Sequence, residues 1–225
     1  MPRGMSRSGV LFDVDGTLVD SNYLHIVAWL RAFRAAGFPD VTGAQVHRCV
    51  GMGGGLLLET LIGGEDEAAK KGHSTEYERL WPELRPFPKA VELLREVRRR
   101  GGETVLATSA TEEEVGALRR ALDCDDAITE ITSSADVEEA KPAPDIFATA
   151  MAKTGLDPER VVVVGDTRWD AEAATRAGLR CVGLRSGGIA EAELRDAGCV
   201  AVYDDAASLL ASFDSSPLGT LLAPT

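Results

Sequence analysis

The sequence predicts an α/β protein in which a parallel β-sheet forms the core and a helical domain is inserted after the first strand. Short, fully apolar runs such as "VVVV" alternate with helical segments in the second half of the chain, and such runs are typical of parallel strands that are buried on both faces. A long stretch after the first strand has helical patterns only. With 225 residues, of which 44% are hydrophobic, the chain is long enough for one large domain or two small ones.

The first half of the chain is expected to contain one strand followed only by helices. The run "GVLFDV", residues 9–14, is apolar and β-branched and predicts the strand. Apolar residues at helical spacing predict a helix over 22–37, which a glycine is expected to end. Three further helical segments follow, "TGAQVHRCVG", "GLLLETLIGG" and "DEAAKKGHSTEYERLWPEL". We therefore expect two domains, a core of residues 1–20 and 85–225 and an inserted helical domain of residues 21–84.

The second half of the chain is expected to alternate between strands and helices. A proline begins and two glycines end the helix predicted over 88–102. Strands are then predicted in "ETVLATS", "AITEITS", "RVVVVGD", "RCVGLRS" and "CVAVYDD", and helices in "EEEVGALRRAL", "PDIFATAMAKTG", "DAEAATRAG", "AEAELRDAG" and "AASLLASF". The tail, residues 214–225, is small, polar and proline-bearing, so we expect it to be loosely held.

The charge, the cysteines and the apolar runs argue against several classes of protein. A net charge of −12 argues against a nucleic-acid partner, which would need a basic face. The four cysteines lie far apart without a CxxC pair, which favours buried, reduced thiols over disulfides or a zinc site. No run approaches the roughly 18 apolar residues of a membrane span, and no apolar signal segment precedes the first strand. We therefore expect a cytoplasmic protein without membrane contact, acting as a monomer or a small homo-oligomer.

Polar side chains follow three of the predicted strands, at the point where each strand ends. Ligands bind in the crevice at this end of an open parallel sheet, so these side chains are expected to meet there. Each of them alone could simply cap the next helix. Four carboxylates in one crevice, however, require a cation, and oxygen ligands favour a hard one such as Mg²⁺. The expected metal ligands are Asp13, Asp15, Asp166 and Asp170, and the neighbouring hydroxyls are those of Thr108 and Ser109.

Lys141 is a further candidate for this crevice. It is one of five lysines in the chain, and Pro142 and Pro144 stiffen the loop that carries it. A solvated surface charge is the simpler interpretation. A lysine beside a carboxylate-bound metal would, however, neutralise the charge of a transferring phosphoryl group. Together with the carboxylates, Lys141 indicates chemistry on a phosphate ester.

Four segments together resemble the sequence motifs of the haloacid dehalogenase superfamily. They are "DVDGT", the apolar strand that ends at Thr108, Lys141 before a proline, and "GDTRWD", in the expected order and spacing. The helical insert resembles the α-helical cap of the phosphoglycolate phosphatases and β-phosphoglucomutases of that superfamily. The resemblance covers residues 10–213. It implies a Rossmann-like core with five parallel strands at its centre and a mobile cap that closes over the crevice.

The resemblance also implies a role for each core residue. Asp13 would be the nucleophile that forms an aspartyl-phosphate, and Asp15 would be the general acid and base. Thr108 and Lys141 would hold phosphoryl oxygens. An acidic residue at position 15 argues against dehalogenation, because a halide needs no proton when it leaves. The implied contacts of Mg²⁺ are the Asp13 carboxylate, the Asp15 backbone carbonyl and Asp166, with Asp170 orienting or joining these ligands.

Two residues of the insert are candidates for contacting substrate. Arg48 precedes the glycine-rich segment "GMGGG" and could bind a substrate carboxylate if this segment faces the crevice. The alternative is a flexible turn between two helices. The segment follows a helix and lacks a Gly-Lys-Ser/Thr sequence, which argues against a phosphate-binding loop. His25 is interpreted as a packing histidine, although related mutases have a histidine at the matching position.

The sequence therefore predicts a Mg²⁺-dependent phosphomonoester hydrolase that acts on a small phosphorylated metabolite. A phosphomutase is the alternative within the same chemistry, because it would return the phosphoryl group to a sugar instead of giving it to water. A phosphate-accepting signalling receiver is an alternative from a different class, since it also uses a strand-end aspartate, Mg²⁺, a hydroxyl and a lysine. Such a receiver would have neither the helical insert nor a second aspartate two residues after its acceptor.

Overall fold

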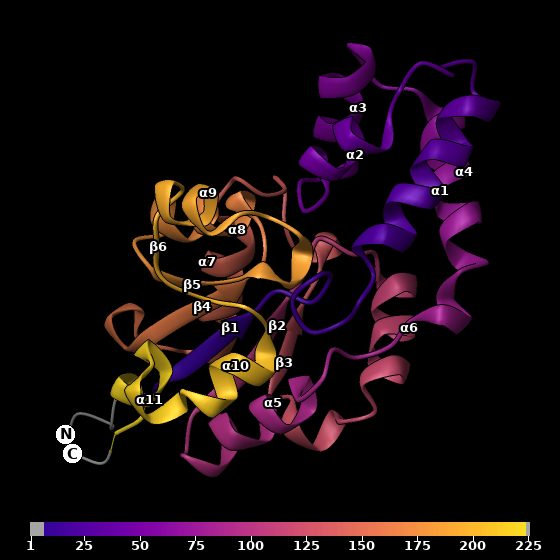
Figure 1. Ribbon diagram of the computed structural model, residues 1–225. Helices are drawn as coiled ribbons and strands as arrows, with labels where there is room; N and C mark the ends of the chain where they lie inside the picture. The colour runs from indigo at the N-terminus through magenta and orange to yellow at the C-terminus, as the bar shows by residue number, and fades with distance from the viewer. Residues whose placement is uncertain (1–6, 224–225) are drawn as a thin grey trace.

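The computed structural model describes residues 7–223, and its central feature is a six-stranded β-sheet (Figure 1). All neighbouring strands are parallel, in the order β3–β2–β1–β4–β5–β6. The predicted α/β class is confirmed, and the sheet has one strand more than the five that the resemblance places at its centre. The strands are β1 (Gly9–Phe12), β2 (Glu103–Ala107), β3 (Glu130–Thr132), β4 (Val161–Gly165), β5 (Arg180–Leu184) and β6 (Cys199–Tyr203).

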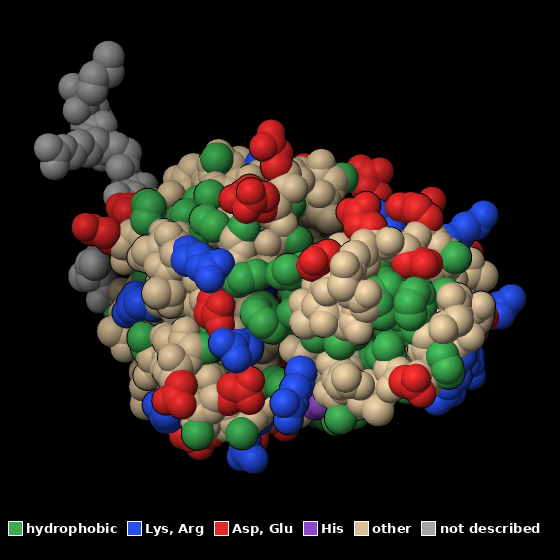
Figure 2. All heavy atoms as spheres, turned by 90° about the horizontal axis from the view of Figure 1, so that it is seen from above, with side chains coloured by type: hydrophobic (Ala, Val, Ile, Leu, Met, Phe, Trp, Pro, Cys, Tyr) green, Lys and Arg blue, Asp and Glu red, His purple; other side chains and the backbone are tan. Residues whose placement is uncertain are grey.

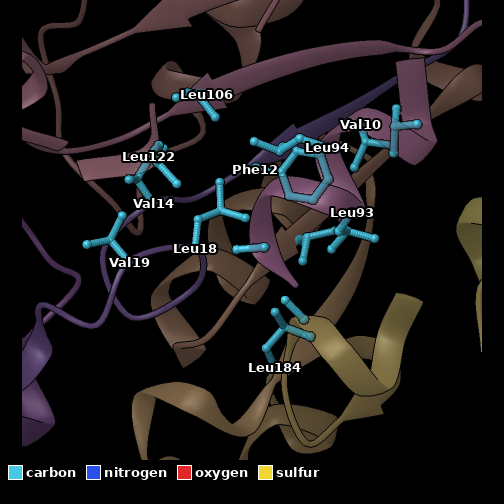
Figure 3. Packing of buried hydrophobic residues seen from close by; sticks show 14 of the residues in the cluster. Val10, Phe12, Val14, Leu18, Val19, Leu93, Leu94, Leu106, Leu122 and Leu184 are labelled. Carbon is cyan, nitrogen blue, oxygen red and sulfur yellow. The ribbon is translucent and has the colours of Figure 1, made fainter. Parts of the chain in front are cut away.

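The strands alternate buried side chains between two hydrophobic layers. Val10 and Phe12 of β1 belong to the layer in Figure 3, whereas Leu11 between them belongs to the layer on the opposite face. Helices cover both faces, as expected for a parallel sheet. On the first face lie α5 (Ala90–Arg99), α6 (Glu112–Leu122), α10 (Ala206–Ala211) and α11 (Pro217–Leu221), and on the second lie α7 (Asp145–Thr154), α8 (Arg168–Arg176) and α9 (Glu191–Asp196).

Four helices between β1 and α5 form a separate lobe to one side of the sheet (Figure 1). Their own hydrophobic cluster includes Trp29, Phe33 and Leu58, and the partly buried Trp169 of the core packs against it. The structure places no strand among residues 22–78. The four helices are α1 (Asn22–Ala35), α2 (Gly43–Cys49), α3 (Gly54–Ile62) and α4 (Glu67–Glu78).

Two chain segments connect this lobe to the sheet, and they pair with each other. The backbone N–H of Asp20 donates to the carbonyl of Arg85 at 2.9 Å, and that of Phe87 donates to the carbonyl of Leu18 at 2.9 Å. Val19 and Pro86 form an antiparallel bridge between these two bonds. The chain therefore enters and leaves the lobe through one short two-stranded ribbon.

The expectation of a loosely held tail is wrong for the described part of it. Leu218 and Leu221 of α11 are buried in the layer shown in Figure 3. Ser216 is fully buried, and its Oγ accepts hydrogen bonds from the backbone N–H groups of Leu218 and Gly219. A serine at the N-cap followed by proline at the first helical position is a helix-start signal. The prediction failed because it was based on the small, polar composition of the tail and not on this signal for a short, packed helix.

The structure agrees with the expectation for the four cysteines. Cys49, Cys124, Cys181 and Cys199 are buried and free, as predicted for reduced thiols. Within residues 7–223, none of the helices combines the length and the apolar character that a membrane crossing requires.

Candidate active site

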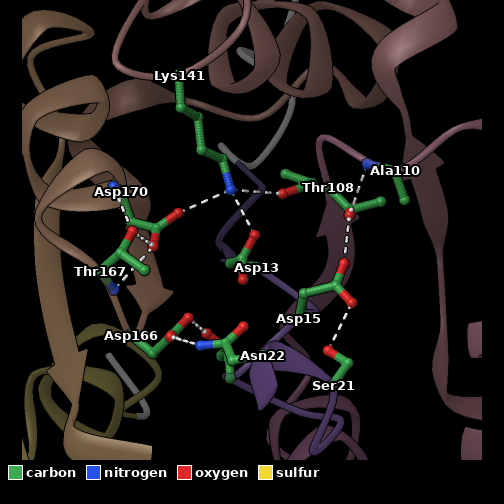
Figure 4. A network of polar contacts seen from close by, with 12 residues as sticks. Asp13, Asp15, Ser21, Asn22, Thr108, Ala110, Lys141, Asp166, Thr167 and Asp170 are labelled. Atoms are coloured by element: carbon green, nitrogen blue, oxygen red, sulfur yellow. Dashed lines mark hydrogen bonds and ion pairs between the residues drawn. The ribbon is translucent and has the colours of Figure 1, made fainter. Parts of the chain in front are cut away.

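The candidate site lies at the carboxyl ends of β1, β2 and β4 (Figure 4). Asp13 follows β1, Thr108 follows β2 and Asp166 follows β4, as the positions of the apolar runs predicted. The chain leaves β1 toward β2 on one side and returns to β4 on the other, so β1 and β4 flank the point where the strand order reverses. Open α/β sheets bind ligands in the crevice at such a point.

Three buried carboxylates meet at this crevice. The structure brings carboxylate oxygens of Asp13, Asp166 and Asp170 within 4.8 Å of one another. Hydrogen bonds orient Asp166, because its Oδ1 accepts from Thr17 Oγ1 at 2.8 Å and its Oδ2 accepts from Asn22 Nδ2 at 2.8 Å. This arrangement presents oxygen atoms from three different chain segments to one point.

The electrostatics of this cluster are those of a site that could hold a cation. Burial raises the pKa of Asp13 to about 7, although the charge of Lys141 opposes that shift. Burial and the neighbouring Asp13 and Asp170 carboxylates raise the pKa of Asp166 well above its ordinary value. The buried Oδ1 of Asn22 has no hydrogen-bond partner among the described residues. A hard cation would relieve this repulsion, and the oxygen donors present are of the kind that such ions take.

Lys141 is a buried partner of this cluster and not a surface charge. Its ammonium group donates to Asp13 Oδ1 and lies 2.7 Å from Asp170 Oδ1 (Figure 4). Its side chain is 1% exposed. Burial lowers the pKa of Lys141, but the charges of Asp13 and Asp170 outweigh that effect and raise it above the ordinary value. Lys141 therefore stays charged, and its ammonium group touches Asp13, the residue that the resemblance implies to be the nucleophile.

The carboxylate of Asp15 points away from the other three and toward the helical lobe. Its Oδ1 accepts from Ser21 Oγ at 2.6 Å and lies 3.4 Å from His25 Nε2, while its Oδ2 accepts from Thr108 Oγ1 at 3.4 Å. Burial raises the pKa of Asp15, but the hydrogen bond and charge of His25 and the Ser21 bond together lower it below its ordinary value. The Asp15 side chain is thus not part of the three-carboxylate cluster, and it has its own set of partners.

His25 and His73 form a second polar feature beside Asp15. His25 Nδ1 lies 3.2 Å from His73 Nε2, and the His25 ring stacks on Tyr77 with centroids 3.8 Å apart. Burial lowers the pKa of His25, but the contact with Asp15 raises it by more. Burial and the charge of His25 hold the pKa of His73 well below its ordinary value. His73 is not among the residues predicted from the sequence, although the presence of only three histidines in the chain was a signal that could have drawn attention to it.

A cavity of about 380 Å³ opens over Asp13, Asp15 and the two histidines, between the core and the lobe. The predicted residues Asp13, Asp15, His25, Thr108 and Ser109 line it, as does the glycine-rich segment 51–55. Arg48 does not line it and is exposed. The reason lies in α2, where Val46 and Cys49 face the hydrophobic cluster of the lobe and thereby turn Arg48 toward solvent.

Comparisons with known proteins agree with this geometry. The family model for haloacid dehalogenase-like hydrolases matches residues 10–184. The protein SUPPRESSOR OF QUENCHING 1, chloroplastic, of Arabidopsis thaliana is 32% identical over 210 residues, which are 88% of this chain, and the chain spans 20% of that longer protein. A phosphoglycolate phosphatase of Pseudomonas putida is 31% identical over 188 residues, 79% of this chain and 69% of the relative.

Two further comparisons extend to other phosphatases and to solved structures. A phosphorylated carbohydrates phosphatase of Thermotoga maritima is 31% identical over 176 residues, 76% of this chain and 81% of the relative. The crystal structure of a hydrolase from Pseudomonas syringae superposes with a TM-score of 0.87 at 36% identity, over 93% of this chain and 99% of that one.

The family model spans the chain from β1 to β5 and so contains every core residue of the site. The resemblance stated from the motifs is confirmed by this match. The expectation of a phosphoric monoester hydrolase is confirmed by the family model together with relatives that are named phosphatases. The chain therefore belongs to the haloacid dehalogenase-like hydrolase family.

Proposed function

We propose that this protein is a Mg²⁺-dependent phosphatase that hydrolyses a small phosphorylated metabolite through an aspartyl-phosphate on Asp13. The observation that carries the proposal is the separation of two carboxylates only two residues apart in sequence. Asp13 lies with Lys141 and the acidic cluster, whereas Asp15 lies with Ser21 and His25. This separation supports an attacking role for Asp13 and a proton-transfer role for Asp15.

In the proposed first step, an oxygen of Asp13 attacks the phosphorus atom and the bond from phosphorus to the ester oxygen breaks. Lys141 and Thr108 hold the phosphoryl oxygens. Asp15, which is ionised at rest, takes a proton from the neighbouring His25 and passes it to the leaving oxygen. In the second step, Asp15 takes a proton from water, which attacks the aspartyl-phosphate and releases inorganic phosphate. Ser21 and His25 keep the Asp15 carboxyl in place during both steps.

The proposed metal ligands are Asp13 and Asp166, with the Asp15 backbone carbonyl, and Asp170 beside them. Mg²⁺ bound there would neutralise the charge that builds up on the phosphoryl oxygens and on the buried carboxylates. Thr167 holds Asp170 through hydrogen bonds from its hydroxyl at 2.6 Å and its backbone N–H at 3.1 Å. These bonds fix the direction of the Asp170 carboxylate before any ion binds.

We also propose the division into a core of residues 1–20 and 85–225 and a cap of residues 21–84. The separate hydrophobic cluster of the lobe and the paired connecting segments support it. The cavity lies between core and cap, so movement of the cap would widen or narrow the access of substrate to it.

A phosphomutase remains the second candidate, because His25 occupies the position of a histidine in related mutases and touches the proposed acid–base residue. A mutase would keep water away and pass the phosphoryl group to a second hydroxyl. A signalling receiver is disfavoured by the cavity, because a cavity of this size suits a small-molecule ester.

The experiment that tests the proposal is repeated release of inorganic phosphate from p-nitrophenyl phosphate in the presence of Mg²⁺. We expect many turnovers per enzyme, none with Asp13→Asn, and a phosphoryl group on the Asp13 peptide after a rapid acid quench. Release of one phosphate equivalent only would support a receiver. Isomerisation of a sugar phosphate without phosphate release would support the mutase, and unimpaired turnover by Asp13→Asn would refute the nucleophile.

A further inference from the structure

Part of the cavity wall that the helical lobe contributes is apolar. Trp29 of α1, Met52 of the glycine-rich segment and Leu57 of α3 line it, and each is less than 10% exposed. Trp29 is held rigidly, because its ring stacks on His73 with centroids 4.1 Å apart and an interplanar angle of 15°. Hydrophobic side chains gather where the two lobes meet in Figure 2. An apolar face on the part of a ligand beyond its phosphate can therefore pack against aromatic and aliphatic carbon of this wall.

The charged groups around the cavity mouth are mostly negative. Glu114 at the start of α6 and Glu138 in the loop before Lys141 line the cavity in addition to the two catalytic aspartates. The only lysine or arginine among the described lining residues is Lys70 of α4, which is exposed and makes no ion pair with any of them. Glu114 is fixed in place, because its carboxylate accepts a hydrogen bond from the backbone N–H of Thr111 at 2.7 Å.

This arrangement has a consequence for the leaving group. A carboxylate or second phosphate on the substrate would enter a space lined by Glu114 and by the exposed Glu138. The cationic side chains on the described part of its wall are the exposed Lys70 and His25, and His25 already pairs with Asp15. An anion that loses water without gaining a partner is strongly disfavoured. An uncharged group with an apolar face would instead release water from both itself and the wall.

We propose that the cavity selects phosphomonoesters whose leaving group is uncharged and presents an apolar or aromatic face, and that it discriminates against leaving groups with a second anionic group. This inference rests on the proposed phosphatase function and adds the class of substrate. Trp29, Met52 and Leu57 supply the attraction. Glu114 and Glu138 supply the repulsion.

A matched pair of substrates tests the proposal. Phenyl phosphate and 4-carboxyphenyl phosphate have the same ring and the same ester bond and differ in one carboxylate. We expect kcat/KM to be at least about tenfold higher for phenyl phosphate, and the ratio to fall as salt screens the repulsion. A ratio of one or less would overturn the proposal.

Variants then assign the discrimination to residues. Glu114→Gln removes the charge but keeps a side chain that can serve the same cap of α6, and Glu138→Gln removes the second charge. We expect each variant to lower the ratio of kcat/KM between phenyl phosphate and 4-carboxyphenyl phosphate by severalfold. Glu139→Gln is the control, because Glu139 is an exposed neighbour that does not line the cavity, and it should leave this ratio unchanged. Equal effects of Glu138→Gln and Glu139→Gln would remove Glu138 from the proposal. Met52→Ala should lower kcat/KM for phenyl phosphate more than for methyl phosphate.

A binding measurement separates failure of this inference from failure of the proposed function. Phenylphosphonate and 4-carboxyphenylphosphonate cannot be hydrolysed, so their dissociation constants for the Mg²⁺-loaded protein can be compared without turnover. Tighter binding of phenylphosphonate by about tenfold, corresponding to about 1.4 kcal/mol, would support the inference even if no ester were hydrolysed. Equal or tighter binding of the carboxylated compound would refute it, even in a protein that proves to be an active phosphatase.

Discussion

Replacing Asp13 with asparagine should make the metal-free protein more stable while it abolishes phosphate release. Burial raises the pKa of Asp13 to about 7 from a value of 3.8. The difference of about 3 pKa units corresponds to about 4 kcal/mol of free energy of unfolding. Above pH 7 the ionised Asp13 therefore destabilises the folded state by up to about 4 kcal/mol relative to an uncharged side chain of the same shape.

The pH dependence of this effect has a definite sign. Because the pKa of Asp13 is higher in the folded than in the unfolded protein, its stabilising contribution is complete below pH 3.8 and is lost as the pH rises to about 7. The asparagine variant has no such titration. Its advantage should therefore reach about 4 kcal/mol at pH 8 and shrink to less than about 1 kcal/mol at pH 4.

Urea unfolding in EDTA, followed by circular dichroism at pH 8 and pH 4, measures both differences. Asp40→Asn is the matched control, because Asp40 is exposed and makes no ion pair among the described residues. Mg²⁺ should stabilise the wild type more than the Asp13→Asn variant. If the variant gained no more stability at pH 8 than the control, or gained equally at both pH values, buried repulsion at Asp13 would not be destabilising the fold.

Four further outcomes are expected. EDTA should abolish hydrolysis and Mg²⁺ should restore it, with Ca²⁺ a poor substitute because it takes more ligands at longer distances; full activity after exhaustive chelation would contradict the metal assignment. Asp15→Asn should lower kcat by about 10² to 10⁴-fold, less for p-nitrophenyl phosphate than for alkyl phosphates, and equal losses for both would refute the proton-transfer role. His73→Phe keeps the ring stack but loses the bond to His25, so kcat for alkyl phosphates should fall by about tenfold, whereas an unchanged kcat would make His73 a packing residue. Arg48→Ala should leave kcat/KM within about twofold, because Arg48 is exposed outside the cavity; a large rise in KM would show that the cap brings Arg48 to the substrate.

The core of the site could be predicted because its residues sit at strand ends. Asp13, Thr108 and Asp166 each follow a short apolar run, and parallel strands bring their carboxyl ends to one edge of the sheet. The position of each residue along the chain therefore determines its place in space. The six strands themselves were predicted from short apolar runs, and their observed boundaries differ by only a few residues.

The cap side of the site could not be predicted in this way. His25 and His73 meet only because α1 and α4 pack against each other, and the two residues are 48 positions apart. Helical periodicity tells which face of each helix is buried, but it does not tell which residues of two helices lie opposite each other. Arg48 shows the related limit, since its orientation depends on how Val46 and Cys49 seat α2 in the cluster of the lobe.

The paired segments at Asp20 and Arg85 would give the proposed cap a single pivot. A lobe attached by one strand could swivel freely, whereas a lobe attached by a hydrogen-bonded ribbon tilts about one axis. In such a tilt, displacement grows with distance from the axis, as along a lever. Ser21 follows the ribbon directly and His25 lies one turn further, so both would move little, while the glycine-rich segment 51–55 at the far side of the cavity would swing widely. The enzyme could then exchange product for substrate without dismantling the contacts that hold Asp15.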